Sequence, residues 1–113
     1  MLGTATRQSI ADALDAVTGV NGYRFRPKAL KAGDAFPVLV QAQREVANAW
    51  SATFDIYLIL GGDEEAAMTK AESLLPDVVD SLSSVVFADQ VRAVTVQTGA
   101  GDLFALLVQC RGD

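Results

Sequence analysis

The stretch WSATFDIYLIL, residues 50–60, decides the fold, together with GGDEEAAMTKAESLL, residues 61–75, which follows at once. The first stretch alternates with a period of two, and one of its faces carries Trp50, Ala52, Phe54, Ile56, Leu58 and Leu60. Such alternation, rich in aromatic and β-branched residues, predicts a long strand with one buried face. Two glycines then end the strand, and Asp63, Glu64 and Glu65 stand where a helix N-terminus favours negative charge. The pattern therefore predicts a strand that turns directly into a helix able to fold back over its apolar face.

The remaining elements follow from the same periodicities. Apolar residues at helical spacing predict a first helix over 4–17, with Thr4 or Thr6 as its N-cap. Further strands are predicted over 23–26, 37–43, 91–98 and 102–110, and the last two are joined by a hairpin at 99–101. Pro37 is expected at the first position of its strand, where a missing N–H is tolerated. The basic loop 27–36 is longer than most connections, so we expect it to make contacts.

The helix that starts near Asp63 contains Pro76, which predicts a kink, or a break followed by a further turn through Leu82. Hairpins punctuated by helices predict an α+β fold in one domain, residues 1–113. We expect a largely antiparallel sheet of four to five strands, with a mixed sheet as the alternative, and two helices packed on one face.

The other face of the sheet is expected to carry Leu39, Tyr57, Ile59 and one side of the last strand. That strand is apolar on both sides, which predicts either a central strand or one whose second face meets a neighbouring subunit. An open face that is half apolar would be an interaction surface.

Composition narrows the class of protein. The chain has 113 residues, half of them hydrophobic, which is typical of a globular domain. A net charge of −5 argues against a dedicated nucleic-acid binder, since such proteins carry a basic footprint. No apolar run approaches the roughly 18 residues that cross a bilayer, so no membrane partner is expected. The single cysteine, Cys110, cannot form an internal disulfide, and this fits a reducing compartment or an assembly that is indifferent to cysteine.

The sequence contains no constellation of residues that is typical of a catalytic site. The chain has no histidine, which excludes Ser-His-Asp and Cys-His arrangements and histidine metal sites. One cysteine cannot form a thiolate zinc cluster. The glycine pair 61–62 lacks the lysine and the glycine spacing of a phosphate loop, and the acids after it would repel an anion. We therefore expect no enzyme, no cofactor and no metal.

Charge is segregated along the chain. A basic segment contains Arg24, Arg26, Lys28 and Lys31, and the region 63–89 is acidic. Two interpretations stay open: solvated faces, or head-to-tail complementarity between copies of the chain. Charge reversal at Arg24 and Arg26 tests the second, because it must alter assembly and its salt dependence.

The expected interface combines basic, acidic and rim residues. Its members are Arg24, Arg26, Lys28, Lys31, Arg44, Trp50, Asp63, Glu64 and Glu65. Trp50 at the rim of the hairpin fits either a core cap or a partner anchor, since tryptophan is enriched at interface hot spots.

In order, length and composition, the chain resembles the tail terminator proteins of long-tailed (siphovirus-type) bacteriophages. The features that carry the resemblance are TRQSIADALDAV, YRFRP, WSATFDIYLIL, GGDEEAAMTKAESLLPDVVDSL and the strand pair around TGAGD. The resemblance implies a homohexameric ring that docks on the last ring of the tail tube and stops its polymerisation. The same ring would offer a docking surface to head-completion or connector proteins.

The implied partners are other copies of the chain, the tail tube protein and a head-completion protein, with DNA only passing through the channel. The implied location is the head-proximal end of the virion tail, after assembly in the host cytoplasm. We expect part of the acidic excess to line the channel. The alternatives are a head–tail connector or stopper protein, and a non-viral adaptor domain that acts as a monomer or dimer.

Overall fold

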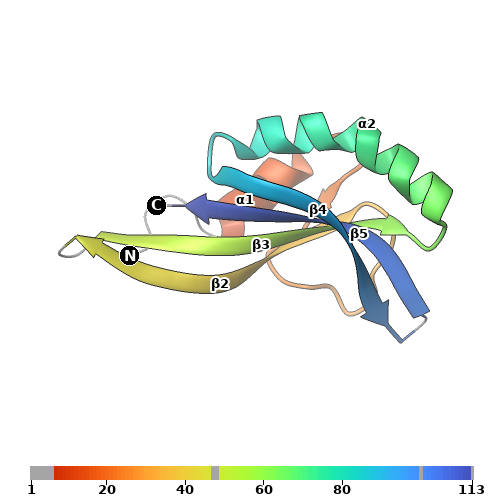
Figure 1. Cartoon of the computed structure of the whole chain (residues 1–113), viewed down its shortest axis with the longest axis horizontal. Helices are drawn as coiled ribbons and strands as arrows, with labels where there is room; N and C mark the ends of the chain where they lie inside the picture. The colour runs from red at the N-terminus through yellow and green to blue at the C-terminus, as the bar shows by residue number, and fades with distance from the viewer. Residues whose placement is uncertain (1–6, 47–48, 100, 113) are drawn as a thin grey trace.

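The computed structural model describes residues 7–46, 49–99 and 101–112, with the backbone alone described at 43–46, 49–51 and 112. Its elements are α1 (Arg7–Asp15), β1 (Asn21–Gly22), β2 (Asp34–Val46), β3 (Ala49–Gly61), α2 (Glu64–Leu82), β4 (Phe87–Thr98) and β5 (Gly101–Gly112). They form a five-stranded mixed sheet in the order β1-β2-β3-β5-β4, and both helices lie on one face of it (Figure 1). The predicted α+β class is confirmed.

The alternation of β3 fixes which face the helices cover. Phe54, Ile56 and Leu58 are each at most 2% exposed and pack against α1 and α2 in the main core. Leu14 from α1 and Ala67 from α2 meet them there. Removing such apolar surface from water is the main favourable term in folding, so this layer holds the molecule together.

β5 lies between β3 and β4, as the apolar character of both its faces predicts. Leu106 and Val108 face the helices, while Ala105 on the opposite face is equally buried. The hairpin from β4 to β5 closes with Thr98 opposite Gly101, so the predicted turn at this point is correct.

α2 begins as its acidic residues predict. The Oδ2 atom of Asp63 accepts a hydrogen bond from the backbone N–H of Ala66 at 2.9 Å, which satisfies a donor of the first turn. Pro76 does not break the helix, which continues to Leu82. The proline removes the bond to the carbonyl of Glu72, but both residues are exposed, so water can reach that carbonyl.

Two strand boundaries differ from the prediction. Residues 23–26 are not a strand; the short strand is β1, which pairs parallel with β2 at Asp34 and Ala35. β2 begins at Asp34, so Pro37 lies inside the strand instead of at its start, and the loop before it spans 23–33 instead of 27–36. β2 has no strand partner beyond Ala35 on that side among the described residues, and an edge position tolerates the missing N–H. The predicted caps Thr4 and Thr6 lie outside the described residues.

The open face differs from the prediction as well. Leu39 lies opposite Phe54 and therefore on the helix side, whereas Val38 lies opposite Asp55 on the other face. A register shift between Leu39 and Gln41 makes Val40 an extra residue, so the alternation of β2 changes faces there. The pairing with β3 decides which side faces the helices, and the periodicity of β2 alone does not contain this information.

Part of the second face is covered by the chain itself. Phe36, Ile59, Val96 and Ala105 form a small buried cluster on which Leu30 of the loop 23–33 packs. The rings of Phe36 and Tyr57 stack there with centroids 5.6 Å apart. The expectation of an open face at Ile59 is therefore wrong, because the basic loop folds over this end of the sheet.

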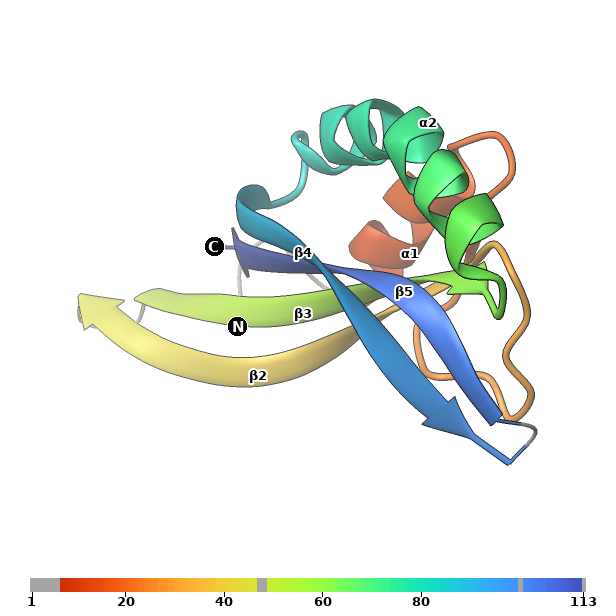
Figure 2. The same ribbon diagram turned by 45° about the vertical axis from the view of Figure 1, so that its right-hand side comes forward.

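The two hairpins diverge. The end of β2 and the end of β4 lie at opposite ends of the molecule, and the sheet twists between them (Figure 2). The far part of β2–β3 extends past both helices (Figure 1). Consequently Leu39 is 39% exposed although it lies on the helix side.

Candidate interaction surface

The side chains that carry chemistry are dispersed. Among residues 7–46, 49–99 and 101–112, no three acidic or cysteine side chains gather closely enough to hold a metal ion. Cys110 is fully buried, and burial, followed by the negative charges of Asp89 and Asp55, raises the pKa of its thiol from 9.0 to about 12. A thiol in this environment stays protonated at neutral pH and is a poor nucleophile. In the part of the chain that is described, no helix is long and apolar enough to cross a bilayer.

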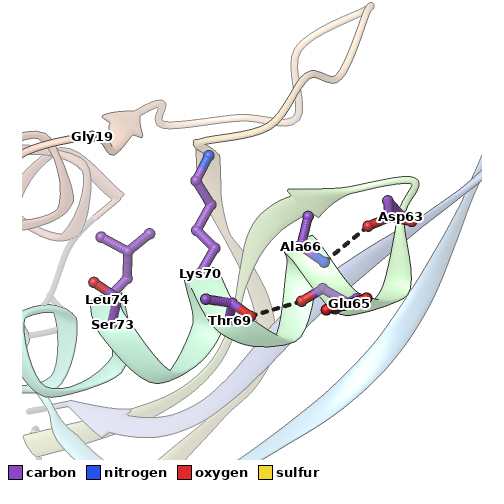
Figure 3. A pocket seen from close by; sticks show the side chains of 8 residues that line it. All are labelled: Gly19, Asp63, Glu65, Ala66, Thr69, Lys70, Ser73 and Leu74. Carbon is purple, nitrogen blue, oxygen red and sulfur yellow. Dashed lines mark hydrogen bonds between the residues drawn. The ribbon is translucent and has the colours of Figure 1, made fainter.

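A hollow lies beside the first half of α2 (Figure 3). It measures about 640 Å³ and is bordered by Gly19 and by Asp63, Glu65, Ala66, Thr69, Lys70, Ser73 and Leu74. Its polar side chains are exposed, and the carboxylate of Asp63 is already engaged in the helix cap. The Thr69 hydroxyl donates to the backbone carbonyl of Glu65. The hollow is a surface depression in which the polar groups do not converge on one point.

The edge of β2 is closed at one point by an arginine of α1. The guanidinium of Arg7 donates from Nη1 to the carbonyls of Arg24 (3.1 Å) and Pro37 (3.0 Å). It also lies over the ring of Phe25, with Cζ 4.5 Å from the centroid. Arg7 thus ties α1 and the loop to β2 just where Pro37 lacks an N–H.

Beyond this arginine, apolar side chains are exposed along β2. Val38, Leu39 and Val40 are 40%, 39% and 55% exposed, and Phe25 beside Arg7 is 60% exposed. We call these four residues the β2-edge patch. Natural sheets protect their edges with charges, prolines and bulges, and here Pro37 and the bulge at Val40 interrupt the edge before the mainly polar residues that begin at Gln41. Exposed apolar groups on an unpaired edge favour contact with another chain.

The opposite edge, β4, carries its own exposed aromatic residue. Phe87 is 63% exposed and lies beneath the guanidinium of Arg111, whose Cζ is 5.2 Å from the ring centroid. Nε of Arg111 bonds Oδ2 of Asp89 at 2.9 Å, an exposed ion pair at the bulge of β4. Such an exposed pair contributes little stability by itself.

The structure places the basic segment and the acidic start of α2 at the same end of the folded molecule. The methyl group of Ala32 lies beside Gly61, so the loop that carries Arg24, Arg26, Lys28 and Lys31 runs next to the residues that precede Asp63, Glu64 and Glu65. All seven side chains are exposed, and in the described residues no ion pair joins the two groups. Arg26 instead donates from Nη2 to the backbone carbonyl of Gln97 at 3.0 Å.

For the predicted rim residues Arg44 and Trp50, the structure describes the backbone alone. The two residues lie opposite each other in the β2–β3 ladder. The predicted contacts of their side chains lie outside the described part of the chain.

Sequence reasoning missed Arg7, Phe25 and Phe87. A lone exposed phenylalanine next to an arginine, as in RF at 24–25, is the signal that was available for one of them. Arg7 gives no such signal, because its acceptors are backbone carbonyls far along the chain.

Among known proteins, the chain matches no protein-family model and no curated protein. Its function therefore rests on the residues and the surfaces described above.

Proposed function

We propose that this protein is a ring-forming structural protein of a bacteriophage tail, which caps the tail tube, ends its polymerisation and presents a docking surface to head-completion proteins. The observation that carries the proposal is the exposed apolar β2-edge patch. Such a patch favours contact with other chains. The resemblance in element order to the tail terminator proteins identifies the kind of assembly.

Ring formation needs two different patches on each copy, because head-to-tail association uses unlike surfaces. The β2-edge patch and the β4 edge around Phe87 are two such surfaces, and they lie at opposite edges of the sheet. The basic loop and the acidic start of α2 add charges that no ion pair within the described chain satisfies. In the proposed ring these charges contribute mainly to the choice of partner and the rate of association.

The experiment is to mix the purified protein with isolated tail tubes and to image them by electron microscopy. We expect a ring of density at one end of each tube and an end to tube elongation when tube protein is supplied. Val40→Glu, which places a charge on the β2-edge patch and leaves the core intact, should lose this density. Tubes that elongate unchanged and carry no extra density would refute the proposal. A stable dimer that ignores the tubes would favour an adaptor domain.

A further inference from the structure

The sheet has two edges without a strand neighbour. β1 pairs with β2 only at Asp34 and Ala35, so among the described residues no strand lies beside the rest of β2. β4 is the last strand on the other side. An unpaired edge presents a row of N–H and C=O groups that pair readily with another strand.

The hydrogen bonds show where the open part of β2 begins. The carbonyls of Gly33, Ala35 and Pro37 accept hydrogen bonds from outside the β2–β3 ladder, and at Pro37 the donor is Arg7. In an antiparallel pair the outward-pointing groups recur at every second residue, so the N–H and C=O of Leu39 point the same way. Leu39 lies just past the last of these contacts, and its side chain belongs to the β2-edge patch.

The open part of β4 follows from the same reasoning. Thr98 and Gly101 close the two-residue hairpin, so the next pair, Gln97 and Asp102, is a wide pair whose backbone groups point outward. The bond from Arg26 to the carbonyl of Gln97 agrees with this direction. The backbone N–H and C=O groups of Thr95 therefore also point outward, two residues before the Gln97 carbonyl that Arg26 occupies.

We propose that the outer edge of β2, from Leu39 onward, pairs with the outer edge of β4, residues 87–95, of the next copy. The neighbouring long strands are all antiparallel, so β2 and β5 run one way while β3 and β4 run the other. In a ring with cyclic symmetry every copy has the same orientation to the axis. β4 then meets the next β2 in antiparallel fashion, and the alternation continues from copy to copy.

The register within one copy indicates how neighbouring copies are placed. Leu39 lies opposite Phe54, which lies opposite Cys110, which lies opposite Ala88. The open part of β2 thus starts at the level where β4 starts, and the two open stretches overlap only if adjacent copies are staggered along the strands. Closed rings of strands require such a stagger together with a tilt of the strands to the axis. The pairing therefore fits a closed ring with tilted strands.

This inference deepens the proposed function, on which it rests, by naming the strands that join the copies. The main test is Leu39→Pro, which removes one outward N–H. It leaves the ladder to β3 intact, because that N–H points away from β3. The matched control is Leu39→Thr, which removes the same apolar side chain but keeps the N–H. We expect the proline variant to lower the association constant by about tenfold or more, and the threonine variant by about threefold or less.

Hydrogen exchange of the unmodified protein supplies a second readout, which holds even if the proline variant fails to fold. On raising the protein concentration, amides within 39–46 and within 87–95 should both become protected. Equal weakening by the two variants would overturn strand pairing in favour of side-chain contact alone. Protection of β2 without β4 would show that β2 edges pair with each other in a twofold dimer, and would overturn the assignment.

The two proposals fail in different ways. A ring on tail tubes that leaves both edges unprotected would refute the strand pairing and leave the proposed function standing. A chain that remains single at every concentration, with tail tubes present, would refute both.

Discussion

β3 and β2 are neighbouring strands with similar apolar content, and their side chains have opposite surroundings. Ile56 and Leu58 in β3 are fully buried beneath the helices. Val38 and Val40 in β2 are 40% and 55% exposed. Val38 lies on the face away from the helices and Val40 lies at the bulge of the edge strand, so the same kind of side chain is buried in one strand and exposed in the next. Apolar alternation therefore shows which residues favour burial, but not whether the same chain or a second copy buries them.

The largest expected effect contrasts these two strands directly. Ile56→Ala should lower the free energy of unfolding by about 2–5 kcal/mol, because it leaves a cavity in the packed layer. Val40→Ala should change it by about 0.5 kcal/mol or less in dilute protein, since the side chain is largely in water. Urea denaturation followed by circular dichroism measures both. Equal losses would mean that the β2-edge patch already belongs to the core of the single chain.

Arg7 lies at the boundary between the two regions. Arg7→Ala should lower the free energy of unfolding by roughly 1–3 kcal/mol, since the carbonyls of Arg24 and Pro37 lose a charged donor and Phe25 loses the cation over its ring. Arg7→Lys should recover only part of this loss, because an ammonium group lacks the planar fork. Gln8→Ala on the same turn, whose amide donates a hydrogen bond to the exposed Asp12, is the control. A loss at Gln8 as large as that at Arg7 would contradict the role given to Arg7.

The smallest effect is a dependence on alkaline pH that comes from the buried side of the sheet. The raised pKa of Cys110 means that the folded chain keeps the thiol proton while the unfolded chain releases it above about pH 9. Stability from this group is therefore complete below that pH and decreases as the pH rises toward about 12. Cys110→Ala should show a smaller decrease between pH 8 and pH 10 in matched urea titrations. Identical slopes for the two proteins would contradict the burial of this thiol.

Much of the buried layer could be predicted from the sequence. The alternation of residues 50–60 and the acidic start at Asp63 are local signals, and both correspond to the elements found. The central position of β5 was one of two outcomes that the sequence predicted, because a strand that is apolar on both sides needs cover from its own chain or from a neighbouring subunit.

The surface was less predictable because it depends on contacts between distant parts of the chain. The face on which Leu39 lies is set by its pairing with Phe54, and the bulge at Val40 is not marked by glycine or proline. Burial of Ile59 depends on a loop that returns to the sheet through Leu30. The proximity of the basic loop to the acidic start of α2 is equally a property of the folded chain, seen where Ala32 lies beside Gly61.

The central claim is that copies of this chain cover one another's exposed edges, and the most direct measurement is the particle mass in solution over a range of concentrations. Light scattering or native mass spectrometry should show single chains that convert to a closed ring of six, with tail tubes promoting the conversion. A mass that stays at one chain under all these conditions, or at two chains independent of concentration, would contradict the account.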